Sequence, residues 1–269
     1  MKTYPEPPDG LAVERDGAVL RLRLDRPDRR NAVTDDMVVA MIETIEAAGS
    51  DESVRVMELS GAGEHFCSGF DLGLRGGDDG KPRAGATQRQ MRWHVNRLIP
   101  TMLETQTPIV TRATGWVIGL GLHLVLASDF AVVADDARLR APFATMGFTP
   151  DSGGSWLIPR LAGVARAKEM LMLGREVSGA QAAGWGLVHR SASAAEVPRV
   201  AAELVAELGS AATVAVGLSK LLIQRGLTVD LERHLADEAF AIELASRSDD
   251  FHEYAQARRE KRDPEFRGR

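Results

Sequence analysis

The chain has little of several features that mark particular classes of protein. Its 269 residues include one cysteine, Cys67, so an internal disulfide is impossible and a metal site built on several thiolates is excluded. Aromatic residues make up only 5% of the sequence, and no window reaches the roughly 18 apolar residues that a membrane-spanning helix needs. We therefore expect a protein of the reducing cytoplasm with no membrane partner.

The charge balance also lacks the excess of one sign that a nucleic-acid partner requires. Acidic residues outnumber basic ones by 38 to 33, which gives a formal net charge of -5. The arginine-rich segments "RPDRR" and "RDPEFRGR" are local clusters, which are usually solvated. No spacing of His, Asp and Glu suggests a metal ligand set, so we expect neither nucleic acid nor a metal.

The first part of the sequence alternates between strand and helix patterns. We predict a hairpin around Asp16-Gly17, a helix from Thr34 to Ala48 with Thr34 as its N-cap, and a buried strand at "VRVMELSG". A helix from about Thr87 to Leu103, a strand at "TPIVTRAT", a turn and helix at "GWVIGLGLHLVLAS" and a strand at "DFAVVAD" follow. This alternation favours an α/β fold with crossover helices.

After Pro159 the pattern becomes helical. The expected helices span about 163–174, 178–185, 196–209, 213–225, 229–246 and 249–261. We divide the chain into a core, 1–195, and a C-terminal helical portion, 196–269, that could cover the core or pack on another subunit. Residues 75–86, rich in Gly, Asp, Lys and Pro, are predicted as a mobile loop.

Two glycine-flanked segments could present backbone amides to a ligand. In "HFCSGFDL" an apolar run ends at Ser68-Gly69, and in "GWVIGLGLHLVL" residues Gly119, Leu120 and Gly121 open an apolar helix. Two amides aimed at one point would form an oxyanion hole, where each donor contributes about 3–4 kcal/mol to a transition state. Alternatively, the glycines only let a helix pack closely on a strand. The missing third glycine argues against a dinucleotide site.

Five segments in order resemble one known family. They are "LDRPDRRNAVTDDM", "VMELSGAGEHFCSGFDL", "GWVIGLGLHLVLASDFAVVADDARLRAPFATMGFTPDSGG", "LMLGREVSGAQAAGWGLVHR" and the closing "EKRDPEF". From about residue 11 to 266 the chain resembles the enoyl-CoA hydratase/isomerase (crotonase) family. The resemblance implies a ββα spiral core and C-terminal helices that form homotrimers, often paired into homohexamers. It also implies an acyl-CoA thioester substrate, so coenzyme A enters as part of the substrate and no separate cofactor is expected.

The resemblance assigns roles to residues around the two amides. The amides of Ser68 and Leu120 would hold the thioester oxygen, although Leu120 stands where the family often has glycine. The arginines that would meet the coenzyme's phosphates could equally be solvated surface charges. The implied contacts with the coenzyme A ester are Arg29, Arg30, Ala32, Gly69, Phe70 and Asp71.

The acid–base residues distinguish the family's reactions. Hydration needs two carboxylates, and the hydratases of this family have glutamates at positions that match His123 and Phe143. Phe143 cannot move a proton, so an isomerase is favoured over a hydratase. The "PDSGG" turn with Asp151 resembles, in particular, that of the ring-1,2-epoxyphenylacetyl-CoA isomerases, and one carboxyl group suffices for a 1,3-proton shift.

The environment of Asp151 leaves two roles open. Desolvation against Phe143, Phe148 and Trp156 would raise its pKa toward a value that suits proton transfer. Alternatively, Asp151 is a turn or N-cap residue ahead of a helix at 155–161.

Three further side chains are candidates for a pocket or for the core. His123 is either a pocket residue or a hydrogen-bonded core histidine, and His94 is either a pocket wall or a helix surface residue. Cys67 is expected to be a small buried residue. Besides the isomerase, the sequence allows a hydratase that uses His123 and Asp151, or a non-catalytic subunit that binds acyl-CoA.

Overall fold

A six-stranded sheet forms the centre of the protein. The computed structural model describes residues 4–71, 73 and 83–269. The strands run in the order β1-β2-β3-β4-β6-β9, and every neighbouring pair except β1 and β2 is parallel. Their bounds are β1 Leu11–Asp16, β2 Val19–Leu24, β3 Val56–Gly61, β4 Ile109–Ala113, β6 Phe130–Ala134 and β9 Arg190–Ala192. The predicted α/β class is therefore confirmed.

The N-terminal elements form where their patterns predict them. In the hairpin Asp16 pairs with Val19 and Leu11 with Leu24, and alternate residues of β2 point into the core. Helix α1, Asp35–Gly49, begins after Thr34, whose hydroxyl accepts a hydrogen bond from the third helical amide at 3.2 Å.

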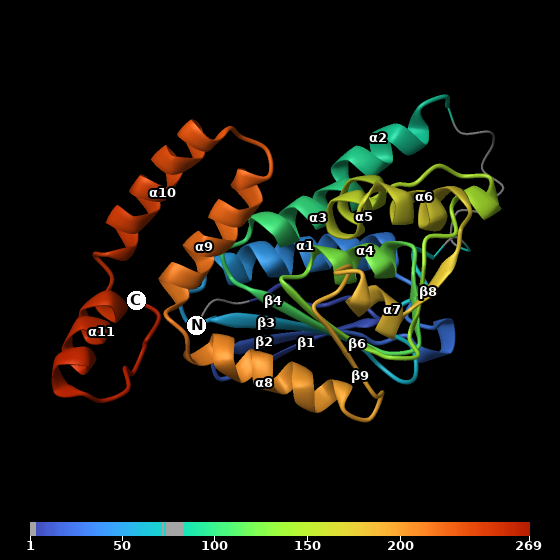
Figure 1. Ribbon diagram of the computed structural model, residues 1–269. Coiled ribbons are helices and arrows are strands. Elements are labelled where there is room, and N and C mark those ends of the chain that lie inside the picture. The colour runs from blue at the N-terminus through green and yellow to red at the C-terminus, as the bar shows by residue number, and fades with distance from the viewer. Residues whose placement is uncertain (1–3, 72, 74–82) are drawn as a thin grey trace.

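Helices cover both faces of the sheet. Helix α8, Val197–Ser210, packs across one face, while α1 and α4, Leu120–Ala127, lie over the other (Figure 1). A small second sheet joins three-residue strands: β5 Trp116–Ile118, β7 Arg138–Arg140 and β8 Glu176–Ser178. Helix α8 begins at Val197 and packs on the core sheet. The division of the chain into a core and a C-terminal helical portion at residue 195 stays a prediction.

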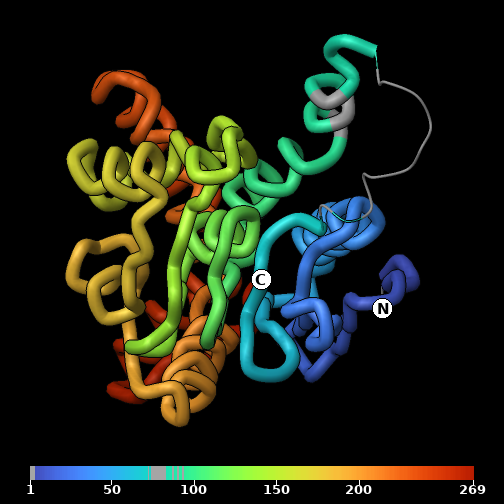
Figure 2. Tube along the Cα trace, turned by 90° about the vertical axis from the view of Figure 1, so that its right-hand side faces the viewer, coloured from blue at the N-terminus to red at the C-terminus, as the bar shows by residue number. Residues whose placement is uncertain are grey.

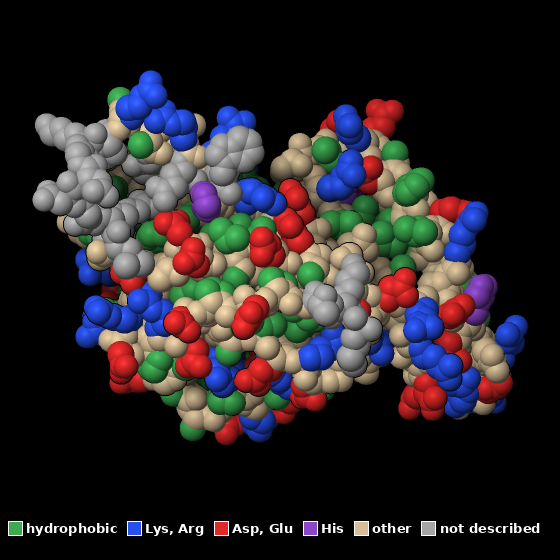
Figure 3. Space-filling model, turned by 180° about the vertical axis from the view of Figure 1, so that it is seen from behind, with side chains coloured by type: hydrophobic (Ala, Val, Ile, Leu, Met, Phe, Trp, Pro, Cys, Tyr) green, Lys and Arg blue, Asp and Glu red, His purple; other side chains and the backbone are tan. Residues whose placement is uncertain are grey.

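The last three helices extend to one side of the core (Figure 1). They are α9 Thr213–Gly226, α10 Leu231–Ala245 and α11 Asp249–Glu260. Acidic and basic side chains are interspersed over the face of the molecule that Figure 3 shows. No single helix in the described ranges is long and apolar enough to cross a membrane; α8 and α9 meet that test only as a pair, bent by 110°.

A buried ion pair fastens α9 to the core. The Lys220 ammonium, only 5% exposed, lies 2.8 Å from Oδ2 of Asp129 and donates to the carbonyl oxygen of Met102 at 2.9 Å. Burial is the largest influence on both pKa values: it lowers that of Lys220 and raises that of Asp129. Each charge therefore depends on the other for its stability.

One prediction about the middle of the chain was wrong. The single helix expected from Thr87 to Leu103 is two helices, α2 Ala86–Trp93 and α3 Val95–Glu104, because the backbone leaves helical geometry at His94 (φ -121°, ψ -98°). Helix α2 projects from the rest of the chain in Figure 2. Apolar spacing did not show the break because both helices keep the same period.

The other helices of the second half are close to their predicted ranges. They are α5 Gly154–Ala162, α6 Val164–Met172 and α7 Gly179–Gly184. Helix α5 starts and ends within one residue of the helix expected at 155–161. Most of the predicted loop, residues 75–82, lies outside the described residues.

Candidate active site

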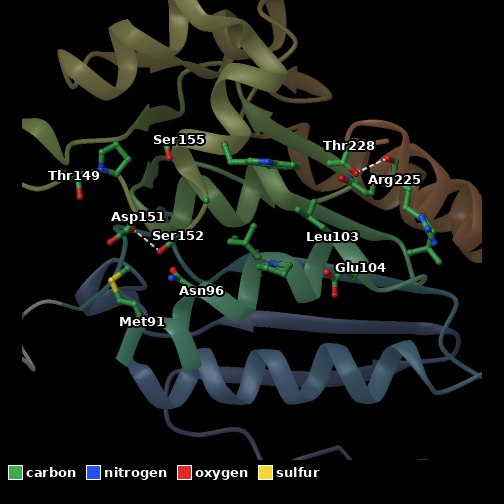
Figure 4. Close-up of a pocket in the computed structure, with 17 residues that line it drawn as sticks. Met91, Asn96, Leu103, Glu104, Thr149, Asp151, Ser152, Ser155, Arg225 and Thr228 are labelled. Carbon is green, nitrogen blue, oxygen red and sulfur yellow. Dashed lines mark hydrogen bonds between the residues drawn. The ribbon is translucent and has the colours of Figure 1, made fainter. Parts of the chain in front are cut away.

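A cavity of about 700 Å³ lies between α3, α5 and α9 (Figure 4). One face of α3 forms its longest wall, with lining residues at helical spacing from Asn96 to Glu104. These two residues are eight positions apart, so this wall is roughly 12 Å long at 1.5 Å per residue. Between its ends the cavity is mainly apolar, with Ile99, Leu103 and Trp156 among its walls.

Asp151 stands at one end of this cavity, close to Ser152 and Asn96 (Figure 4). It belongs to a tight turn in which Ser152 and Gly153 both have positive φ, 46° and 83°. The backbone carbonyl of Asp151 accepts the N–H of Gly154 at 3.0 Å, which closes the turn.

Two expectations about Asp151 need correction. Gly153, not Asp151, occupies the N-cap position of α5, so the N-cap alternative is wrong and the turn alternative is confirmed. Phe148 was expected to shield Asp151 from water, but it is 62% exposed and faces solvent. Trp156 does line the same cavity.

The first amides of α4 have the availability that an oxyanion hole requires. Leu120 is the first residue of the helix, and its N–H has no acceptor among the residues that the structure describes. Gly69 lies against this helix start with φ 104°, and a side chain there would approach the Ile118 carbonyl oxygen to 3.2 Å. Only glycine combines that backbone conformation with so close an approach.

The second amide is not the one predicted. The Ser68 N–H donates to the carbonyl oxygen of Arg30 at 2.9 Å, so it is already used within the fold and the assignment of Ser68 was wrong. Both residues flanking Phe70 hydrogen-bond to Val33, at 2.9 and 2.8 Å, so the Phe70 N–H points away from Val33, to the side where α4 begins. Phe70 therefore replaces Ser68 as the candidate donor.

The two segments that carry the predicted coenzyme-binding residues lie side by side, because Phe70 pairs with Val33 along the main chain. Side chains add further contacts. Asp71 uses its carboxylate in an ion pair with Arg26, 2.9 Å long, and Arg26 also donates to the carbonyl oxygen of Ala32 at 2.6 Å. The Arg30 guanidinium lies over the ring of Trp116, 4.4 Å from its centroid. Asp71 thus joins two loop segments.

Arg29 is exposed at the end of a short 3-10 helix, Pro27–Arg29. Its carbonyl oxygen accepts from the Ser68 hydroxyl at 3.3 Å. This contact brings the loop that carries Arg29 next to the Ser68-Gly69 segment.

His123 is fully buried beneath the Asp151 turn. Its ring stacks on Phe143 with centroids 5.6 Å apart, and a β-carbon on Gly154 would overlap its Nε2. Neither ring nitrogen has a hydrogen-bond partner among the residues that the structure describes, so the hydrogen-bonded core alternative is wrong. Burial lowers the pKa of His123 to about 4, so the imidazole is uncharged at neutral pH.

Two other candidates lie off the cavity. His94 occupies the break between α2 and α3, and Met91 and Asn96 on either side of it line the cavity instead. Cys67 is buried as predicted, and burial raises the pKa of its thiol to about 12. Within the described ranges no cluster of His, Cys, Asp and Glu could hold a metal ion.

A family model described as enoyl-CoA hydratase/isomerase matches residues 14–269. The chain belongs to the enoyl-CoA hydratase/isomerase family. It is 33% identical to the 1,2-epoxyphenylacetyl-CoA isomerase of Escherichia coli over 93% of this chain and 95% of the relative. It is 28% identical to the 2,3-dehydroadipyl-CoA hydratase of the same organism, over 96% and 99%.

Solved structures of the enoyl-CoA hydratase/isomerase family have the same fold. The enoyl-CoA hydratase of Bacillus anthracis superposes with a TM-score of 0.89 at 29% identity, covering 97% of this chain and 100% of that one. The crotonase fold is therefore established for this chain. The relatives include an isomerase and hydratases, so the choice between the two reactions depends on the residues of the site.

Two residues near Asp151 have contacts that the sequence did not predict. Ser152 and Gly154 flank Gly153 in the turn, where Ser152 contacts the Asp151 carboxylate and Gly154 contacts His123. The doublet of glycines after a serine was the available signal, since such a run permits positive φ and a close approach.

Proposed function

We propose that this member of the family is an isomerase that shifts a double bond, or rearranges a ring, in an acyl-CoA thioester. The amides of Leu120 and Phe70 hold the thioester oxygen, and Asp151 carries the proton. Each amide donor contributes about 3–4 kcal/mol to the enolate-like transition state.

The observation that carries this proposal is the position of Asp151 relative to other acid–base groups. Glu104, the other carboxylate among the described residues that line the cavity, stands at the opposite end of the α3 wall, roughly 12 Å along the helix axis from Asn96. At neutral pH the imidazole of His123 is uncharged, and the side chain of Phe143 is a hydrocarbon that cannot transfer a proton. A proton shift needs one carboxylate, whereas water addition needs two groups that act on the same double bond.

The proposed step conserves atoms and electrons. The Asp151 carboxylate takes a proton from the γ-carbon of the acyl chain, and the C–H electrons form the dienolate, whose charge rests on the thioester oxygen. The enolate then collapses and takes a proton at the α-carbon from the Asp151 carboxyl group, which exchanges its proton with solvent water before the return. The double bond moves by one position, and Asp151 returns to its ionised form.

The shape of the cavity supports a long or ring-bearing acyl group. An extended chain advances about 1.2 Å per bond, so a wall of roughly 12 Å accommodates about ten bonds. A volume of about 700 Å³ is within the range of sites that enclose drug-sized ligands. A four-carbon acyl group would leave most of this space unfilled.

We also propose that the chain forms homotrimers or homohexamers through its C-terminal helices. Large apolar side chains on α9, on α10 and at the C-cap of α9 are exposed in the single chain, which supports self-association. They are Ile223, Leu227, Leu231, Leu235, Phe240, Ile242 and Leu244. Sedimentation equilibrium should give the mass of three or six chains, and a monomer at micromolar concentration would contradict this part of the proposal.

A product screen in D2O tests the proposed reaction. Purified protein is incubated with enoyl-, dienoyl- and aryl-acyl-CoA esters, and the products are identified by mass and NMR. We expect isomers with deuterium at the α- or γ-carbon and no 3-hydroxyacyl-CoA from crotonyl-CoA. Hydration well above background would favour a hydratase using His123 and Asp151, and tight binding without exchange would favour a non-catalytic acyl-CoA-binding subunit.

A further inference from the structure

Ser152 has a conformation that its residue type disfavours. Its φ of 46° is in the left-handed region, which is strained for a residue other than glycine, and Gly153 follows with φ 83°. Ser152 is also 5% exposed, although serine is usually a surface residue. Strained positions of this kind persist where the surrounding structure holds them and are common at functional sites.

The strained backbone directs the Ser152 hydroxyl to Asp151. Its Oγ donates to Oδ1 of the carboxylate at 2.9 Å, and both residues line the end of the cavity (Figure 4). A donor on Oδ1 fixes the rotation of the carboxylate and favours its ionised form. Below the turn, the close fit of Gly154 against the His123 ring limits how far the turn can move.

We infer that Ser152 is a positioning residue that holds the Asp151 carboxylate ionised and oriented toward the acyl chain. The inference rests on the proposed proton transfer by Asp151. It explains why a serine, and not a third glycine, occupies the left-handed position. Besides Asp151, the ionisable side chains among the described residues that line the cavity are Glu104 and Arg225 at its far end, and the uncharged His123 lies beneath the turn.

Three variants separate the hydroxyl from the strain. Ser152→Gly removes both, Ser152→Ala removes the hydroxyl and keeps the strain, and Ser152→Cys keeps the size with a weaker donor. Lys261→Gly is the matched control, because Lys261 has φ 56° at the exposed end of α11, away from the cavity. The measurements are kcat and KM for the isomerisation, each against pH, and the urea midpoint of unfolding.

The expected results differ between a positioning and a structural role. Ser152→Gly should raise the urea midpoint, lower kcat by about tenfold and move the acid limb of the pH profile up by about one pH unit. Ser152→Cys should lie between the wild type and Ser152→Gly. Lys261→Gly should raise the urea midpoint and leave the pH profile unchanged.

The failures of this inference and of the proposed function are distinguishable. An acid limb in Ser152→Gly that coincides with that of the wild type overturns the positioning role, even where Asp151→Asn is inactive. Full turnover by Asp151→Asn overturns the proposed function itself. Should Ser152→Ala fail to fold, Ser152→Gly decides, because glycine adopts the required φ without strain.

Discussion

Replacing Lys220 with methionine should strongly destabilise the protein and loosen α9 over the cavity. The change keeps the length of the side chain but leaves the carboxylate of Asp129, 16% exposed, without its cation. It also removes the donor to the Met102 carbonyl oxygen. Breaking a buried ion pair on one side costs about 3–5 kcal/mol, far more than an exposed pair contributes.

The assay is urea unfolding followed by circular dichroism, with KM for a reactive acyl-CoA as the functional readout. We expect the free energy of unfolding to fall by about 3–5 kcal/mol. KM should rise, because α9 supplies Leu221 and Gln224 to the cavity wall. Adding Asp129→Asn should recover part of the lost free energy of unfolding, because it removes the unpaired charge. Asparagine also keeps an oxygen that can accept the Ile109 N–H, which in the wild type donates to the Asp129 carboxylate at 2.8 Å.

The control for Lys220→Met is Arg199→Met, which breaks an exposed pair with Glu203 on α8. It should leave the urea midpoint nearly unchanged. A loss below about 1 kcal/mol for Lys220→Met, or no recovery in the double variant, would refute the view that this pair secures α9.

Two further predictions concern His123 beneath the turn and Leu103 in the cavity wall. His123→Leu should stabilise the protein at neutral pH by about 1–3 kcal/mol in urea unfolding, because it removes two buried nitrogens that find no hydrogen-bond partner in the described part of the chain. In the wild type, stability should decline as the pH falls from about 6.5 to 4, because the unfolded chain binds a proton at this histidine and the folded protein, with a His123 pKa of about 4, does not. His123→Leu should abolish this decline. An unchanged decline would contradict the reasoning. Leu103→Trp should fill the middle of the cavity and lower kcat/KM for long acyl groups at least about tenfold relative to four-carbon ones; equal losses for both would show that acyl groups bind elsewhere.

The elements that the sequence predicted correctly run over five residues or more. The alternation in β2 and the Thr34 cap of α1 are local signals, and tertiary packing left them unchanged. The strands of the small second sheet are three residues long, which is too short for alternation to be visible. The break at His94 was hidden for a related reason, since the apolar positions of α2 and α3 remain in phase across it.

The choice between Ser68 and Phe70 depended on backbone geometry that no side-chain pattern reveals. Along a regular strand, hydrogen-bonding groups alternate between the two sides. Cys67 pairs with β5, but the positive φ of Gly69 interrupts the alternation, so that Phe70 is the next residue to face that side. The glycine itself was visible in the sequence, whereas the direction of the following amide was not.

Asp151 was identified from the sequence for two reasons, one of which the structure corrects. The resemblance of the "PDSGG" turn placed it correctly at the cavity. The expected apolar enclosure by Phe148 is absent, because that ring faces solvent. The contact that the sequence did not reveal is with Ser152, because it depends on the left-handed conformation of the residue next in the chain.

Deuterium incorporation from solvent into a reactive acyl-CoA tests the proton-carrying role of Asp151 most directly. Wild-type protein, Asp151→Asn and the control Asp136→Asn, an exposed residue after β6, are compared at matched occupancy in D2O. We predict rapid exchange at the α- or γ-carbon for the wild type and the control, and a loss of at least about 100-fold for Asp151→Asn with acyl-CoA binding retained. Exchange by Asp151→Asn at the wild-type rate would contradict the proposed function.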